Sequence, residues 1–315
     1  AFSPTMLESE ATLKSMMLAK RPRSVCLFGT SADPPTGVGG HRGIVMALSN
    51  LVLPATRQPS ASAGASAGEN SCGRSAAAGS GCIVGNKVET SSPRQQLRFD
   101  EIRVIPVYRH MYNSKRGNQT SYNDRLEMCR LAFEGIDRVT VSDCERRCFD
   151  LAAKGLSGDD KVSVRVGTAD LLDMLLEEEA NTNFSFALGA DTFMDLTTLK
   201  WKRSIDLLDL VGSRLMVIYR QVEEEQSRYC EQDLLQRIDK VNKGACKSQS
   251  NGSDAGTNGG PALLLNIPSL EAISSSMART TTDEATLKKL LEPKVLQYIK
   301  QRQFYAFAGQ SSTQQ

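Results

Sequence analysis

Short apolar runs alternate with longer amphipathic stretches, and this alternation most constrains how the chain can fold. Strands buried on both faces read as apolar runs, and a parallel sheet needs crossover helices between them. The apolar runs lie at 24–29, 101–108, 139–143, 184–191, 214–220 and 263–267. Helical patterns occupy 41–53, 122–136, 144–155, 168–180, 227–243, 284–291 and 293–305, with Thr168 placed to cap the fourth. We therefore predict an α/β fold: a Rossmann-like parallel sheet with helices on both faces and the C-terminal helices packed on it.

Two stretches interrupt the alternation, at about 55–96 and 245–260. Their Ser-, Ala- and Gly-rich composition cannot repay the entropy of ordering by burying apolar surface. We predict that both are disordered or mobile insertions and that the first is dispensable. The rest of 23–308 is expected to form one domain, with tails at 1–22 and 309–315.

Charge and cysteine content argue against several classes of protein. The chain has 38 Lys and Arg against 36 Asp and Glu, a net charge of +2, which gives no support to a nucleic-acid or membrane surface. Its eight cysteines lack metal-ligand spacing and read as free thiols in a reducing compartment. We expect a cytoplasmic protein without nucleic-acid or membrane partners; organellar targeting and a homo-oligomer stay open.

The segment that follows the first apolar run is rich in turn-forming residues. The strand should end near Gly29, and Pro34 and Pro35 delay the next helix until about His41. Glycines within 37–40 let backbone N–H groups approach a ligand, and a helix N-terminus suits a phosphate. His41 adds a donor, and a charge if a nearby anion protonates it. The spacing alone leaves open a plain surface turn with His41 as a helix cap; a dinucleotide-binding fingerprint fits less well.

The stretch LFGTSADPPTGVGGH (27–41) resembles the first motif of the nicotinate-nucleotide adenylyltransferases, G-(G/T)-x-x-D-P-P-(H/T)-x-G-H. One difference is that three residues, rather than one, separate Thr36 from Gly40. Either Thr36 keeps its role across a longer loop or Val38 takes its place. Further stretches resemble later motifs of the family in order: SYNDRLEMCRLAF (121–133), VSDCE (141–145), VGTADLL (166–172), LGADTFMDLTTLKW (188–201), ISSSMART (273–280) and EPKVLQYIKQRQFY (292–305).

This resemblance implies a nucleotidyltransferase of NAD biosynthesis. Its substrates would be ATP and nicotinate mononucleotide, and its products nicotinate adenine dinucleotide and pyrophosphate. The nucleophile would be the phosphate of the mononucleotide, which is largely ionised at neutral pH and needs no general base. The resemblance also implies Mg²⁺, carried mainly by the ATP phosphates.

The resemblance assigns roles to individual residues. His41 and Arg279 would be catalytic, while Ser31, Lys115, Thr168 and Trp201 would bind the mononucleotide, with Trp201 stacked on its pyridine ring. The ATP-binding residues would be Gly29, Thr30, Thr36, Gly40, His41, Gly189, Asp191, Ser274, Ser275, Ser276 and Arg279.

Several of these residues, and two others, also have structural interpretations. A helix cap would explain His41 or the serines, and core packing would explain Trp201. Arg125 would support the phosphate region, and His110 reads as a structural or surface histidine.

Other functions stay open at this point. Nicotinamide mononucleotide could replace the acid, or both could react. Pantetheine-phosphate adenylyl transfer, cytidylyl transfer, non-catalytic nucleotide binding and an unrelated oxidoreductase activity are further alternatives.

Overall fold

The structure, a computed structural model, describes residues 21–53, 98–110, 119–211, 215–219, 229–243, 262–267, 270 and 273–308. Lys115, the whole of both predicted insertions, the tail at 309–315 and most of the tail at 1–22 lie outside these residues.

Six parallel strands form one sheet in the order β3-β2-β1-β4-β5-β6, which confirms the predicted α/β class. The strands are β1 (Arg23–Thr30), β2 (Glu101–Pro106), β3 (Val139–Val141), β4 (Thr182–Gly189), β5 (Leu215–Tyr219) and β6 (Leu263–Asn266). Strand order reverses next to β1, whose Phe28 pairs with Ala187 of β4. In a doubly wound sheet a ligand crevice is expected beyond the carboxyl ends of the strands at this reversal.

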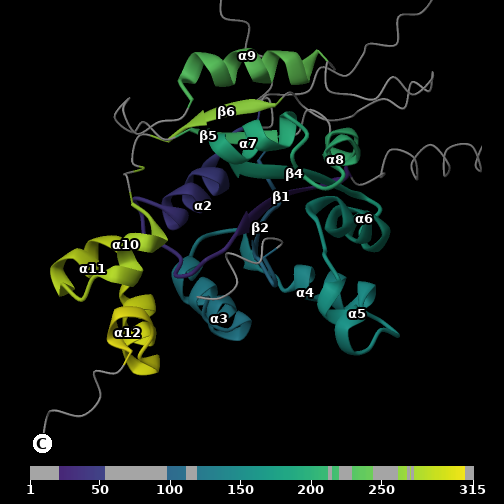
Figure 1. The fold of residues 1–315 in the computed structure, drawn as a ribbon. Coiled ribbons are helices and arrows are strands. Elements are labelled where there is room, and N and C mark those ends of the chain that lie inside the picture. Colours follow the sequence, from purple (N-terminus) through teal and green to yellow (C-terminus); the bar gives the residue numbers. More distant parts are fainter. Residues whose placement is uncertain are drawn as a thin grey trace, which may run out of the picture.

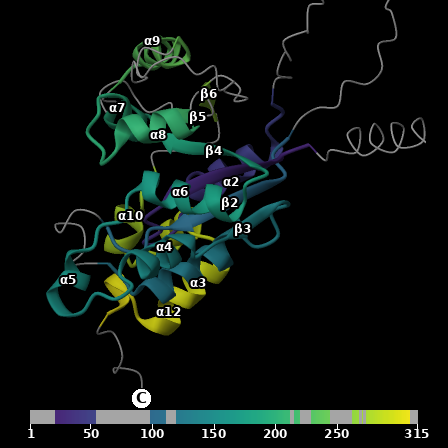
Figure 2. The ribbon, with the colours of Figure 1, turned by 90° about the vertical axis from the view of Figure 1, so that its right-hand side faces the viewer.

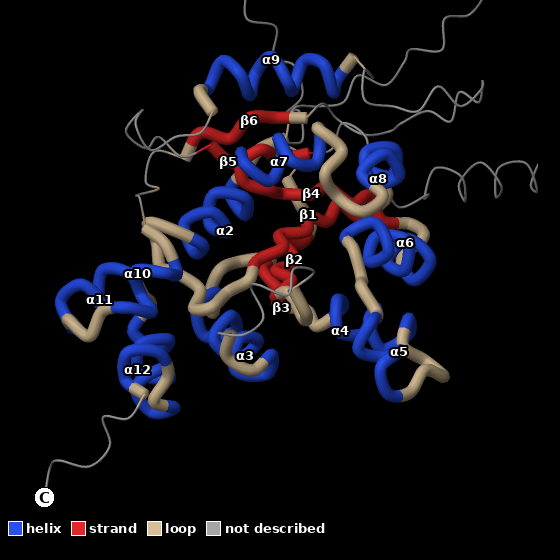
Figure 3. The backbone as a smooth tube through the Cα atoms, in the orientation of Figure 1, coloured by secondary structure: helices blue, strands red, loops and turns tan. Residues whose placement is uncertain are grey.

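Helices cover both faces of the sheet. The longer ones are α2 (His41–Asn50), α3 (Tyr122–Phe133), α4 (Cys144–Ala152), α6 (Thr168–Glu178), α9 (Glu231–Asn242) and α12 (Pro293–Arg302). The shorter ones are α5 (Gly158–Ser163), α7 (Ala190–Thr197), α8 (Ser204–Val211), α10 (Ser275–Thr280) and α11 (Glu284–Leu290), followed by the 3₁₀ turn η2 (Tyr305–Phe307). Figure 1 shows α2 and α10 on one side of β1 and β4, and α6 and α8 on the other. Figure 3 shows the strands as one layer between helices.

The side chains of β1 divide between two hydrophobic cores because successive residues of a strand point to opposite faces. Cys26 and Phe28 join a core built with α2, α3 and α10–α12. Val25 and Leu27 join the other core, built with α4 and α6–α9. The C-terminal helices α10–α12 therefore share a core with one face of the sheet, as predicted. Figure 2 shows α12 and α9 at opposite ends of the molecule.

Two wrong boundary predictions concern candidate site residues. The strand expected at 184–191 ends at Gly189, because Ala190 and Asp191 begin α7. Thr168 does not cap α6 but is its first residue, since the cap is Gly167, whose N–H donates to the Asp170 carboxylate at 2.8 Å. The short helices α5, α7 and α8 were not predicted as elements.

Two further observations concern the described residues alone. None of their helices is both long and apolar enough to cross a bilayer. All five of their cysteines are free thiols, and four of these are buried.

A substitution at Ile299 tests whether the C-terminal helices belong to the core. Its side chain is 1% exposed, so Ile299→Ala should lower the free energy of unfolding by about 2–5 kcal/mol, measured by urea denaturation. Leu235→Ala is the control, because that side chain is 48% exposed and its loss should cost less than about 0.5 kcal/mol. Equal effects of the two substitutions would contradict the packing described above.

Candidate active site

The crevice at the reversal of strand order has room for a ligand. Gly29 and Gly189 are both exposed, although they stand at the ends of the adjacent central strands β1 and β4. A Cβ placed on Gly189 would meet nothing within 4 Å, and one on Gly29 would meet only the Phe186 ring at 3.9 Å. Both predicted ATP-binding glycines thus border open space where β1 and β4 end.

The loop between β1 and α2 is buried and anchored from a distant part of the chain. Asp33 is 3% exposed, and its carboxylate accepts hydrogen bonds from the hydroxyls of Thr120 (2.8 Å) and Tyr305 (2.7 Å). Burial, reinforced by the charge of Asp33, raises the pKa of Tyr305 and keeps its hydroxyl a donor. Tyr305, close to the last described residue, therefore fixes this loop.

His41 is oriented by Thr36, which is completely buried. The Thr36 hydroxyl lies 2.7 Å from His41 Nδ1 and accepts from the His41 backbone N–H at 2.9 Å. The backbone N–H of Thr36 points at the same Nδ1 at 3.2 Å, and an N–H can only donate. Nδ1 is therefore an acceptor, and the neutral ring carries its proton on Nε2. This geometry favours the neutral ring over the doubly protonated ring considered from the sequence.

The longer loop keeps Thr36, not Val38, against His41. Val38 is 49% exposed, whereas Thr36 approaches Gly40 so closely that a Cβ on Gly40 would lie 2.0 Å from the Thr36 hydroxyl oxygen. Gly43 is equally constrained, because a Cβ there would lie 1.9 Å from the Val38 carbonyl oxygen. Val38 thus points outward, while Gly40 and Gly43 allow the close approach of the Thr36 hydroxyl and of the Val38 carbonyl.

Helix α10 contacts the same loop. Ser275 donates to the Pro34 carbonyl at 2.8 Å, and Arg279 donates to the Asp33 carbonyl. Arg279 also contacts the Ser276 hydroxyl at 2.8 Å. Ser274 is the N-cap of α10, accepting from the backbone N–H of Met277, so for this serine the helix-cap interpretation describes the geometry. The structure therefore places Arg279 and His41 in contact with the same loop.

Arg125 holds the ends of β1 and β2 together. Its guanidinium, 2% exposed, donates to the backbone carbonyls of Ser31 (3.2 Å), Thr120 (3.2 Å) and Tyr108 (3.3 Å). These contacts are structural, and support of a phosphate site by Arg125 stays a prediction. Arg125 fixes the backbone at Ser31, whose side chain is exposed beside Thr30.

A cavity of about 680 Å³ collects three of the predicted residues, Thr168, Asp191 and Trp201. His110, expected to be structural or at the surface, also lines it. The remaining lining residues are Val107, Arg109, Glu145, Arg165, Val166, Gly167, Leu171, Thr192, Asp195, Lys200 and Lys202. Its volume lies in the range of about 300–1,000 Å³ found for small-molecule sites.

The cationic side chains of this cavity differ in their partners. Lys200 pairs with Asp195 at 2.7 Å and Lys202 with Asp170 at 3.0 Å. Arg109 and Arg165 make no ion pair with any residue in the described part of the chain. Two guanidinium groups without a carboxylate partner favour an anionic ligand.

Glu145 lines the cavity and was not singled out from the sequence, although it ends the VSDCE motif. Its carboxylate accepts from the Tyr108 backbone N–H at 3.1 Å. Burial raises the pKa of Glu145 to about 7, against an ordinary value of 4.5. Near neutral pH this carboxyl is only partly ionised, so it opposes an anionic ligand less than an exposed carboxylate would.

Comparison with known proteins finds a shared fold. No protein-family model matches the chain, and no curated protein sequence matches it. Two solved structures of Plasmodium falciparum nicotinic acid mononucleotide adenylyltransferase, one complexed with APC and one with NaAD, are similar to it at 19% identity. Their TM-scores are 0.50 and 0.52, and each alignment covers 90% of this chain and 98% of the other. At this identity the likeness establishes the fold.

The contact between Thr36 and His41 is testable in solution. Thr36→Val removes the hydroxyl but keeps the shape, which should lower the free energy of unfolding by about 1–3 kcal/mol because the His41 backbone N–H loses its acceptor. Ring ¹⁵N shifts should report the Nε2–H form of His41 in the original chain and also in the variant, because the backbone N–H of residue 36 still donates to Nδ1. The chain's two histidines make assignment simple. Thr36→Ser keeps the hydroxyl and should preserve the stability, and a mixture of tautomers in the original chain would refute the geometry.

The raised pKa of Glu145 predicts that the free energy of unfolding depends on pH. Because its folded pKa is raised, the folded protein binds more protons than the unfolded one between pH 4.5 and about 7. The contribution of Glu145 to the free energy of unfolding is fully present below pH 4.5. It is lost as the pH rises through 7, by at most about 1.4 kcal/mol per pH unit. Glu145→Gln should remove this contribution from unfolding curves recorded at pH 5, 6, 7 and 8. An unchanged slope would show that Glu145 titrates normally.

Proposed function

We propose that this chain transfers AMP from ATP to nicotinate mononucleotide and releases nicotinate adenine dinucleotide and pyrophosphate. A phosphate oxygen of the mononucleotide attacks the α-phosphorus of ATP, and the bond from that phosphorus to the pyrophosphate oxygen breaks. The main support is that His41 and Arg279 both contact the buried loop that follows β1. The ordered motifs and the shared fold agree with this function.

His41 and Arg279 would act on charge that develops on the phosphates. The Nε2–H of His41 donates a hydrogen bond to a phosphate oxygen, and the Arg279 guanidinium supplies positive charge beside it. Positioning and charge stabilisation are the main contributions to phosphoryl-type transfer, so no side chain has to act as nucleophile. Thr36, Ser275 and Asp33 fix the positions of these two groups.

The large cavity would hold the mononucleotide. Trp201 offers its ring to the pyridine, and Thr168 lies on the same wall. Arg109 and Arg165 favour an acid on that ring over an amide, because an amide leaves their charge without a counterion. One of the two related structures holds NaAD and the other holds APC, which supports a site for nucleotides.

Magnesium is part of the proposal. Among the residues that the structure describes, no group of three or more His, Cys, Asp and Glu side chains is placed to hold a metal ion. The ion would be held mainly by phosphate oxygens of ATP, which is the usual arrangement for Mg²⁺. It would neutralise charge on the departing pyrophosphate. We also infer a cytoplasmic location, in keeping with the free thiols.

The purified full chain should release pyrophosphate from ATP and Mg²⁺ when nicotinate mononucleotide is added. His41→Ala should lower kcat/KM by about 10²–10³, as the loss of one oxyanion donor does in other enzymes. Met46→Ala is the control, because it changes an exposed side chain of the same helix and should leave the rate unchanged.

The same assay compares nicotinate and nicotinamide mononucleotides, pantetheine phosphate, and CTP in place of ATP. The acid should give the highest kcat/KM. Binding of ATP with no turnover of any substrate would overturn the proposal in favour of a non-catalytic nucleotide-binding protein.

A further inference from the structure

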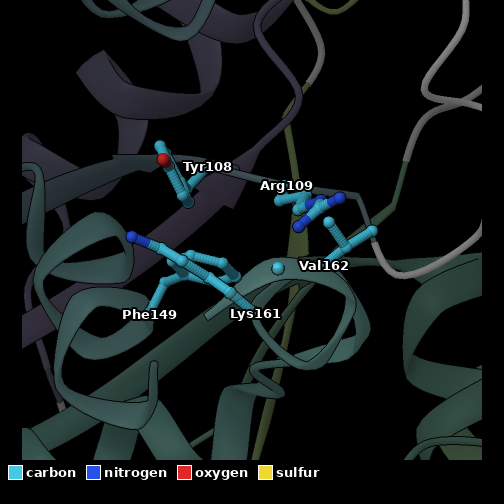
Figure 4. A pocket seen from close by; sticks show the side chains of 6 residues that line it. Tyr108, Arg109, Phe149, Lys161 and Val162 are labelled. Carbon is cyan, nitrogen blue, oxygen red and sulfur yellow. The ribbon is translucent and has the colours of Figure 1, made fainter. Parts of the chain in front are cut away.

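A second cavity, of about 410 Å³, lies beside the large one. Its walls come from the chain after β2 (Tyr108 and Arg109), from α4 (Phe149) and from α5 (Gly158, Lys161 and Val162). Figure 4 shows Tyr108 facing Phe149 and Lys161 across the hollow, with Arg109 and Val162 beside it. The proposed reaction uses none of these residues except Arg109, which lines both cavities.

Two cationic side chains border this cavity, and no carboxylate lines it. Neither Arg109 nor Lys161 makes an ion pair within the described ranges, and the acidic neighbours Asp159 and Asp160 of α5 are exposed and are not part of the wall. An arginine and a lysine at the rim of one hollow suit a phosphate, because the guanidinium binds it through two hydrogen bonds and the ammonium adds a point charge.

The rest of the wall is largely aromatic and apolar. The rings of Tyr108 and Phe149 lie 5.1 Å apart, and the Arg109 guanidinium stands 5.8 Å above the Phe149 ring. Tyr108 is held by an edge contact with Tyr122 at 4.9 Å and by the bond from its backbone N–H to Glu145. Val162 leaves 53% of its surface exposed at the rim. Covering the exposed apolar surface of this wall with the ring of a ligand is favourable.

We propose that this cavity is a second ligand site, which takes a phosphate monoester carrying a flat ring. The phosphate lies between Arg109 and Lys161, and the ring lies against Phe149 and Tyr108 beneath Val162. A mononucleotide belongs to this chemical class, as does a simple aryl phosphate. Because Arg109 also borders the large cavity, a ligand here competes for a charge that the large cavity uses.

Phenyl phosphate is a suitable probe, titrated calorimetrically into the full chain, with inorganic phosphate as the comparison without a ring. Phenyl phosphate should bind one site per chain, and inorganic phosphate about tenfold more weakly because it makes no ring contact. Lys161→Ala should weaken phenyl phosphate about tenfold through loss of a charge-assisted hydrogen bond. Lys154→Ala, an exposed lysine outside the cavity, is the matched control and should have no effect.

The fluorescence of Trp201, the chain's single tryptophan, separates the two cavities. Binding in the second cavity leaves it unchanged, because Trp201 lines only the large cavity, whereas binding in the large cavity alters it. Three results would overturn the proposal: no binding, equal affinity for phenyl phosphate and inorganic phosphate, or binding that quenches Trp201 and ignores Lys161→Ala. None of these readouts requires adenylyl transfer, so failure here is distinguishable from failure of the proposed function.

Discussion

The buried carboxylate of Asp33 is the contact on which the candidate site depends. A carboxylate that is 3% exposed is tolerable only when hydrogen bonds replace its hydration, and Thr120 and Tyr305 supply them. The Asp33 carbonyl and the neighbouring Pro34 carbonyl accept from Arg279 and Ser275 of α10, respectively. The backbone of Gly37 adds a bond to Leu290 of α11 at 2.8 Å. One loop therefore joins the first strand, the β2–α3 connection and the C-terminal helices.

Much of the fold could be predicted from the sequence because buried parallel strands leave a strong signal. All six strands were expected within a few residues of their observed bounds, as were the helices with a clear apolar stripe. The failures have local causes. Helix α5, with no buried residue, carries no apolar period. Helix α7 starts directly after Gly189, so its first turn reads as a continuation of the strand.

The site was only partly predictable. His41, Thr36, Ser275 and Arg279 were identified from motif resemblance, and the structure brings all four to one loop. Their contacts could not be derived, since Asp33 meets Tyr305 across 272 residues of sequence. Glu145 and the unpaired arginines of the cavity were missed, because a raised pKa or a missing ion partner exists only once the chain is folded. Lys115 lies outside the described residues.

The bond between Asp33 and Tyr305 has a consequence for biosynthesis. The loop before α2 leaves the ribosome long before its partners in α10 and η2 exist, because synthesis runs from the N-terminus and domains begin to form during translation. The strands β1–β4 can associate during that interval, but Asp33 then has no partner from the C-terminal region. Helices made after the strands thus complete the loop that precedes His41, so a nascent chain can pair these strands before the loop is fixed.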